Sequence, residues 1–198
     1  MKKSVMLGIA IMAGVLAAGQ ASAGMIGLTR IDPDIASLVI GVDYDASADV
    51  FSASGMATSL TLADTTVQSI AGGTFDLSAM IDGLGAASGG TLTIGGTIPE
   101  LGYTSGTLLT GSLVAYGTDG SQAFEFLFTT TGGDAAALFS PQTGVILNTG
   151  ALSPSLTWSQ DFSNDGFSGT ADAFLVPEPA TVALLALGGL AFAGRRRR

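Results

Sequence analysis

Hydrophobic and polar residues alternate in short runs along most of the chain. The clearest run is QAFEFLFTTT, in which Phe124, Phe126 and Phe128 are expected on one face of a strand. Glu125 then lies on the other face, so the three phenylalanines are the first candidates for the core. Similar runs, separated by Gly, Asp, Ser and Pro, are SLVIGVDYD, ATSLTLA, GTFDLSAM, GTLTIGGTI, GTLLTGSLVAYG, GVILNTG, PSLTWSQDF and TADAFLV.

These runs predict an all-β domain. Roughly nine strands in about 150 residues are typical of an antiparallel β-sandwich, and we expect one of jelly-roll type. Only the segment DAAALF, residues 134–139, favours a turn or two of helix. A chain of 198 residues has room for one domain with a substantial core.

The N-terminus has the three parts of a secretory signal peptide. Two lysines precede an apolar stretch, and the small residues Ala21 and Ala23 stand before Gly24, as the signal peptidase site requires. We therefore expect residues 1–23 to form a signal helix that signal peptidase removes. The alternative, an uncleaved anchor, is disfavoured because the apolar stretch is short and ends in a good cleavage site.

The C-terminus, VPEPATVALLALGGLAFAGRRRR, combines an apolar segment with a basic end. As a helix, residues 180–194 would cover about 22 Å, which is short against a hydrocarbon core of about 30 Å. The four terminal residues hold that end in the cytoplasm and leave everything before the segment outside. These residues are Arg195, Arg196, Arg197 and Arg198. We expect a hydrophobic helix that anchors the chain transiently in the inner membrane.

The motif Pro177-Glu178-Pro179 stands just before this apolar segment. The two prolines keep the motif extended, which is the shape that a protease cleft accepts. The motif, the apolar helix and the arginine cluster together resemble the PEP-CTERM sorting signal of Gram-negative bacteria. This signal is also labelled an ice-binding-protein C-terminal segment. The resemblance implies that the membrane protease exosortase recognises Pro-Glu-Pro, cuts near it and passes the protein to the cell surface or the exopolysaccharide matrix. Ice binding itself is not expected, because only Thr91-Leu92-Thr93 has the Thr-x-Thr form.

Charge is strongly segregated along the chain, which divides into a signal peptide (1–23), an acidic all-β domain (24–175) and a sorting signal (176–198). The formal net charge is −9, but six of the seven basic residues lie at the two ends. Between them Arg30 stands against fifteen acidic residues, a net charge of −14. Such a domain repels nucleic acid and anionic membranes. Extracellular polysaccharide is a candidate partner, and Asp43, Asp45 and Asp49 are interpreted as a solvated strand edge.

The absence of histidine and cysteine limits the chemistry of the domain. It excludes Ser-His-Asp and Cys-His catalysis, the usual zinc sites and thiol redox reactions. A glycosidase needs only two carboxylates and stays a remote alternative. With few aromatic and basic residues to hold a sugar for catalysis, we expect a non-enzymatic protein with a structural or interaction role. A calcium- or glycan-binding module is the main alternative.

The segment DFSNDG resembles the start of a calcium-binding loop. Asp161, Ser163 and Asp165 occupy positions 1, 3 and 5, glycine occupies position 6, and Asp172 occupies position 12. Their oxygens could wrap a calcium ion, the one cofactor that the sequence suggests. The flanks LTWSQ and AFLV have strand character, however, and a polar turn between strands needs no ion. Both interpretations stay open at this point.

Overall fold

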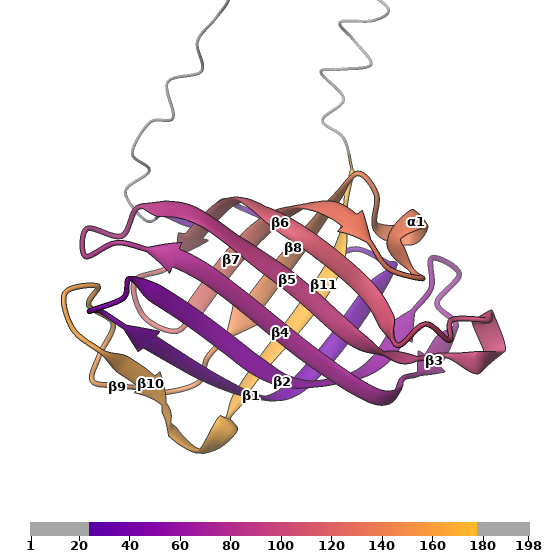
Figure 1. The fold of residues 1–198 in the computed structure, drawn as a ribbon, viewed down its shortest axis with the longest axis horizontal. Helices are drawn as coiled ribbons and strands as arrows, with labels where there is room; N and C mark the ends of the chain where they lie inside the picture. Colours follow the sequence, from indigo (N-terminus) through magenta and orange to yellow (C-terminus); the bar gives the residue numbers. More distant parts are fainter. Residues whose placement is uncertain (1–23, 178–198) are drawn as a thin grey trace, which may run out of the picture.

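The computed structural model describes residues 24–177, and the predicted signal and hydrophobic helices lie outside the described residues. Eight long antiparallel strands run side by side around a closed barrel (Figure 1). They are β1 (Asp34–Asp45), β2 (Val50–Thr61), β4 (Ala71–Ile81), β5 (Ala87–Thr97), β6 (Thr107–Thr118), β7 (Ala123–Gly132), β8 (Gln142–Asn148) and β11 (Gly169–Val176).

Six short elements decorate the barrel. They are β3 (Val67–Ser69), β9 (Leu152–Ser153), β10 (Phe162–Asn164), the 3-10 turns η1 (Pro99–Leu101) and η2 (Asp165–Phe167), and α1 (Ala136–Phe139). The helical turn α1 lies inside DAAALF, where a turn of helix was predicted. Strands β9 and β10 lie beside β1 at the lower left of Figure 1 and lead through η2 into β11.

The barrel closes because its first strand pairs with its last. β1 pairs with β2 on one edge and with β11 on the other, where Asp34 lies opposite Phe174. Around the ring each long strand pairs with the next one along the chain. The predicted jelly-roll sandwich is therefore wrong. Alternate burial is the same in a sandwich and in a small barrel, so the local pattern could not tell them apart.

Side chains fill the interior of the barrel. Phe124, Phe126 and Phe128 are fully buried, as predicted, and every second residue of β4 from Phe75 to Ile81 is buried as well. In a barrel of eight strands the lumen is just wide enough for side chains to fill it. Burying one such phenylalanine is worth about 2–3 kcal/mol, so this core stabilises the closed ring.

One end of the barrel is covered by the loop between β9 and β10. Trp158 in this loop packs edge-on against Tyr44, with ring centroids 5.0 Å apart, and against Phe162 at 5.5 Å. The Tyr44 hydroxyl donates to the carbonyl oxygen of Ile81 at 2.8 Å. The predicted strand PSLTWSQDF is thus mostly a loop, because its tryptophan caps the barrel end instead of alternating along a ladder.

The N-terminal segment lies on the outer wall over β6 and β7. Glu125 points outward, as predicted, but is only 3% exposed, because its carboxylate accepts hydrogen bonds from Gly27 N–H at 2.7 Å and Leu28 N–H at 3.1 Å. Gly117 on β6 lacks a Cβ where the carbonyl oxygen of Gly24 would meet it. This part of the wall is therefore covered.

Within residues 24–177, none of the helices has the length and apolar character needed to cross a membrane.

Candidate functional site: a groove on the outer wall

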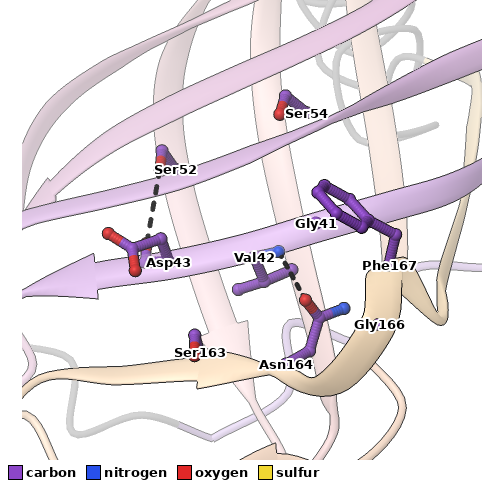
Figure 2. A pocket seen from close by; sticks show the side chains of 9 residues that line it. All are labelled: Gly41, Val42, Asp43, Ser52, Ser54, Ser163, Asn164, Gly166 and Phe167. Carbon is purple, nitrogen blue, oxygen red and sulfur yellow. Dashed lines mark hydrogen bonds between the residues drawn. The ribbon is translucent and has the colours of Figure 1, made fainter.

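The outer wall carries a hollow of about 270 Å³ where β1 and β2 meet the loop that joins β10 to β11 (Figure 2). Its main lining residues are Gly41, Asp43, Ser52, Ser54, Asn164 and Phe167. We name this hollow the Phe167 groove. A second hollow of about 230 Å³ continues from it over β4 and β5, where Asp76 and several hydroxyl side chains line it.

Strand alternation places small polar residues on this part of the wall. From Ile40 to Asp45 on β1 and from Val50 to Ser54 on β2 every second residue faces the interior, which turns the others outward. The strand register puts Asp43 opposite Ser52 and Gly41 opposite Ser54. The four positions therefore form a rectangle of about 7 Å along the strands and about 5 Å across them.

Asn164 fixes the loop side of the groove. Its Oδ1 accepts a hydrogen bond from Val42 N–H at 2.8 Å, and its Nδ2 donates to the carbonyl oxygens of Ile40 at 2.8 Å and Thr149 at 2.9 Å. β11 pairs with β1 as far as Ile40, and β10 pairs with it from Asp43 onward. The Asn164 side chain thus fills the gap in the ladder, and all of these amide contacts are structural.

Phe167 places an aromatic ring across the groove. In Figure 2 the ring lies over β1 at Gly41, where an added Cβ would lie 2.6 Å from two ring carbons. The residue is nevertheless 61% exposed, so the Cδ1–Cε1 edge of the ring lies against the strand while most of the ring is open. Phe167 has φ 55°, and Val39, which lines an adjoining hollow with it, has φ 56°. Such positive φ values are unfavourable for bulky and β-branched residues and gather at functional sites.

The groove carboxylates differ from most acids of the domain. Four of them accept hydrogen bonds from neighbouring turn residues: Asp45, Asp64, Asp82 and Asp119. Within residues 24–177, no hydrogen bond or ion pair reaches the carboxylate of Asp43 or of Asp76. Ser52 Oγ makes only a long contact of 3.4 Å to the backbone oxygen of Asp43. These groups are free to bind something outside the chain.

The residues of the predicted calcium loop do not converge. Asp161 Oδ1 accepts a hydrogen bond from Ala46 N–H at 2.8 Å, while Asp172 pairs in the ladder with Ala36, roughly 30 Å back along the first strand. Ser163 lies opposite Asp43 at the groove. The side chain of Asp165 is outside the described part of the chain. Among residues 24–177 no three acidic side chains are grouped so that they could hold a metal ion.

Asp172 belongs instead to an ion cluster at the far end of β1. Arg30 Nη2 lies 2.7 Å from Asp34 Oδ2, and Arg30 Nη1 lies 3.4 Å from Asp172 Oδ1. Asp34 is completely buried. Burial raises the pKa values of the Asp34 and Asp172 carboxyl groups above their ordinary value. The nearby guanidinium of Arg30 lowers both pKa values, but it offsets only part of the effect of burial. This cluster ties the N-terminal segment to the barrel.

The sequence prediction missed Gly41, Asn164 and Phe167. A signal for the place of the groove, though not for these residues, is the stretch FSASG (51–55), whose outward positions Ser52 and Ser54 are small. A second signal is that a phenylalanine directly after a polar Asn-Asp-Gly turn is placed at the surface. Neither signal names a ligand.

The sorting motif begins directly where the barrel ends. β11 ends at Val176, and the exposed Pro177 follows, whereas Glu178, Pro179 and the arginine cluster lie outside the described residues. A family model described as the PEP-CTERM protein-sorting motif matches residues 175–198. The chain carries a PEP-CTERM sorting signal. The PEP-CTERM match confirms the resemblance and concerns sorting alone, not ice binding.

The PEP-CTERM signal implies an exported protein that exosortase processes and that is sorted to the cell surface. The match includes the last two residues of β11, so no linker separates the barrel from the signal. Searches of curated proteins and of solved structures found no match. The role of the barrel must therefore be argued from its own residues.

Proposed function

We propose that this protein is a non-enzymatic component of the cell surface or the extracellular matrix, and that its barrel binds a partner through the Phe167 groove. The observation that carries the proposal is the exposed ring of Phe167. The ring is held on Gly41 and stands beside Asp43, whose carboxylate has no partner within residues 24–177. Aromatic rings with one free face and nearby unpaired polar groups are typical of binding surfaces.

The position of the groove supports this role. Strand β11 begins two residues after Phe167 and ends at Val176, so the groove lies about 23 Å along the strand from the sorting signal. The transient anchor, residues 180–194, would hold the opposite end of the barrel near the membrane. The groove would then face away from the membrane while the anchor is in place, so it would be accessible before exosortase processing as well as after release.

The spacing of the carboxylates supports a binding role over a catalytic one. Asp43 lies on β1 and Asp76 on β4, with β2 between them. From the strand spacing and register their Cα atoms are about 12 Å apart. Glycosidases hold the carboxyl groups themselves about 5–9.5 Å apart, and outward side chains on the convex wall of a barrel diverge instead of approaching each other. Release of reducing sugar that Asp43→Asn abolishes would overturn the non-enzymatic proposal.

The sorting part is tested by removing the motif. Alanine at Pro177, Glu178 and Pro179 should leave the protein uncut and in the inner-membrane fraction, whereas the unaltered chain is found outside with a lower C-terminal mass. Replacing the four terminal arginines by lysines keeps the charge and serves as the control. Identical location and identical C-terminal mass for the alanine variant and the unaltered chain would contradict processing at this motif.

A further inference from the structure

We infer that the Phe167 groove binds an uncharged polysaccharide, with one hexose ring stacked on Phe167 and its hydroxyl groups directed toward Asp43. This inference rests on the proposed interaction role and adds the class of partner.

The Phe167 ring matches the apolar face of a hexose. A pyranose ring carries several C–H bonds on one face and its hydroxyls around the edge, so that face packs well on an aromatic ring. The Cδ1–Cε1 edge of the Phe167 ring lies against Gly41, where a side chain would collide with it. Because this contact restricts the ring, less side-chain entropy is lost when a sugar stacks on it than for a ring without such a contact.

Polar groups lie at the right spacing around that ring. Asp43 follows Gly41 by two residues on the same face of β1, which places it about 7 Å along the strand. Ser52 and Ser54 stand across on β2 at about 5 Å. These spacings fit a single hexose, whose neighbouring hydroxyls can both donate to one carboxylate. Hydrogen bonds to a charged acceptor are stronger than neutral ones.

Polar residues on the neighbouring strands β4 and β5 extend the groove beyond the length of a single sugar. Ser54 lies opposite Asp76 on β4, and Asp76 lies opposite Thr93 on β5. Four adjacent strands span about 14 Å, so a second carboxylate with hydroxyl neighbours stands within reach of the next sugar units. The continuous hollow over β4 and β5 leaves space for them. This arrangement favours a chain over a single sugar.

The charge of the groove selects among polysaccharides. Asp43 and Asp76 line it, and no basic residue is among the described residues that line either hollow. Together with a domain charge of −14, this repels uronic-acid and phosphate-bearing polymers. A polymer of amines would be attracted by charge alone, without need of the Phe167 ring. The fixed ring and the free hydroxyls therefore favour an uncharged partner.

The experiment uses the full-length protein in mild detergent and measures its affinity for a neutral β-glucan, a neutral galactomannan, alginate and chitosan. We expect binding to at least one neutral polymer, little change in about 0.5 M salt, and none to alginate. Phe167→Ala should weaken binding roughly five- to tenfold and Asp43→Asn about fivefold. Asp76→Asn should weaken binding of long chains more than of short oligosaccharides.

Matched variants separate binding from folding. Phe167→Tyr keeps the ring and should keep the affinity. Leu84→Ala removes another exposed apolar side chain, 87% exposed, in the turn after β4, and Glu100→Gln neutralises an exposed acid, so both should bind as the unaltered protein does. The affinity of a variant is compared with that of the unaltered protein only if both have the same melting temperature.

Three results would overturn the inference: no neutral polymer is bound, Phe167→Ala and Asp43→Asn bind as well as the unaltered protein, or only chitosan is bound and salt abolishes it. Location and C-terminal mass of the same variants report separately on sorting. If the protein is sorted normally but binds no polysaccharide, only the inference that the groove binds an uncharged polysaccharide is rejected. If sorting fails but the polysaccharide is bound, only the proposed cellular location is rejected.

Discussion

The two ends of strand β1 use the same residue type in opposite ways. Asp34, at the first position, is completely buried and lies 2.7 Å from Arg30. Asp43, near the other end, is exposed and has no partner within residues 24–177. The acidic residues of the domain therefore have different roles at the two ends of β1. At one end carboxylates hold the N-terminal segment on the barrel, and at the other end they are available to a ligand.

The largest effect is expected at the buried end. Arg30→Met removes the cation beside Asp34 and leaves a buried charge without compensation, which should lower the free energy of unfolding by about 3 kcal/mol. Arg30→Lys keeps the charge but not the two-pronged contact and should cost less. Urea denaturation measures both. A loss below about 0.5 kcal/mol for Arg30→Met would show that the ion cluster is not structural.

A smaller effect is expected where the ladder of β1 is interrupted. Asn164→Ala leaves the buried N–H of Val42 without an acceptor and should lower the free energy of unfolding by about 2 kcal/mol. Asn164→Asp keeps the acceptor for Val42 but turns a carboxylate oxygen toward the carbonyl oxygens of Ile40 and Thr149, so it should cost at least as much. Both should also weaken binding in the groove, because the loop that carries Phe167 loses its attachment. Unchanged stability in Asn164→Ala would contradict the structural role of this side chain.

The pH dependence of stability should have opposite signs at the two ends. Burial raises the pKa of Asp34 in the folded protein, so the folded state binds this proton more readily than the unfolded chain. Its contribution to stability therefore grows as the pH falls through the raised pKa, and it is complete below the ordinary value of 3.8. Hydrogen bonds from Ser47 lower the pKa of Asp45. Its contribution is present above the ordinary value and is lost as the pH falls through the lowered pKa.

Two asparagine variants check these signs. Between about pH 7 and about pH 4 the unaltered protein should gain stability relative to Asp34→Asn, which has no proton to bind at that position. Below about pH 4 it should lose stability relative to Asp45→Asn. Urea denaturation across this range gives both differences. A constant difference between the unaltered protein and Asp34→Asn would contradict the raised pKa.

The smallest effect on stability is expected in the groove. Phe167 is 61% exposed and Asp43 has no partner within residues 24–177, so Phe167→Ala and Asp43→Asn should each stay within about 0.5 kcal/mol of the unaltered protein. Thermal unfolding measures this directly. A large loss of stability in Asp43→Asn would mean that its carboxylate is structural, and the contrast with Asp34 would fail.

Local pattern predicted the interior of the barrel but not its closure. Phe126 is buried because strand alternation is a local property, and the sequence QAFEFLFTTT displays it. Closure depends on Asp34 meeting Phe174, two residues at opposite ends of the domain. No local pattern encodes that pairing. The sandwich prediction failed at this step, and the strand predicted around Trp158 failed because tertiary packing used that side chain as a cap.

In the candidate site, too, local features were predictable from the sequence and features that depend on long-range contacts were not. The segment DFSNDG and the later Asp172 suggested calcium ligands, but the structure puts Asp161 and Asp172 at different ends of β1. The role of Asn164 depends on a gap between two strands and is visible only once the ladder is known. The sorting signal, by contrast, was fully predictable. Its function depends on a short contiguous segment that another protein recognises, so no tertiary structure is needed to find it.

The most direct test of the account follows the protein in the cells that make it. Unaltered protein and Phe167→Ala are compared for export, C-terminal mass and the fraction retained in the extracellular matrix. The account predicts equal export and equal processing for both, with the unaltered protein retained in the matrix and Phe167→Ala released into the medium. Equal retention of the two proteins would contradict binding through the Phe167 groove.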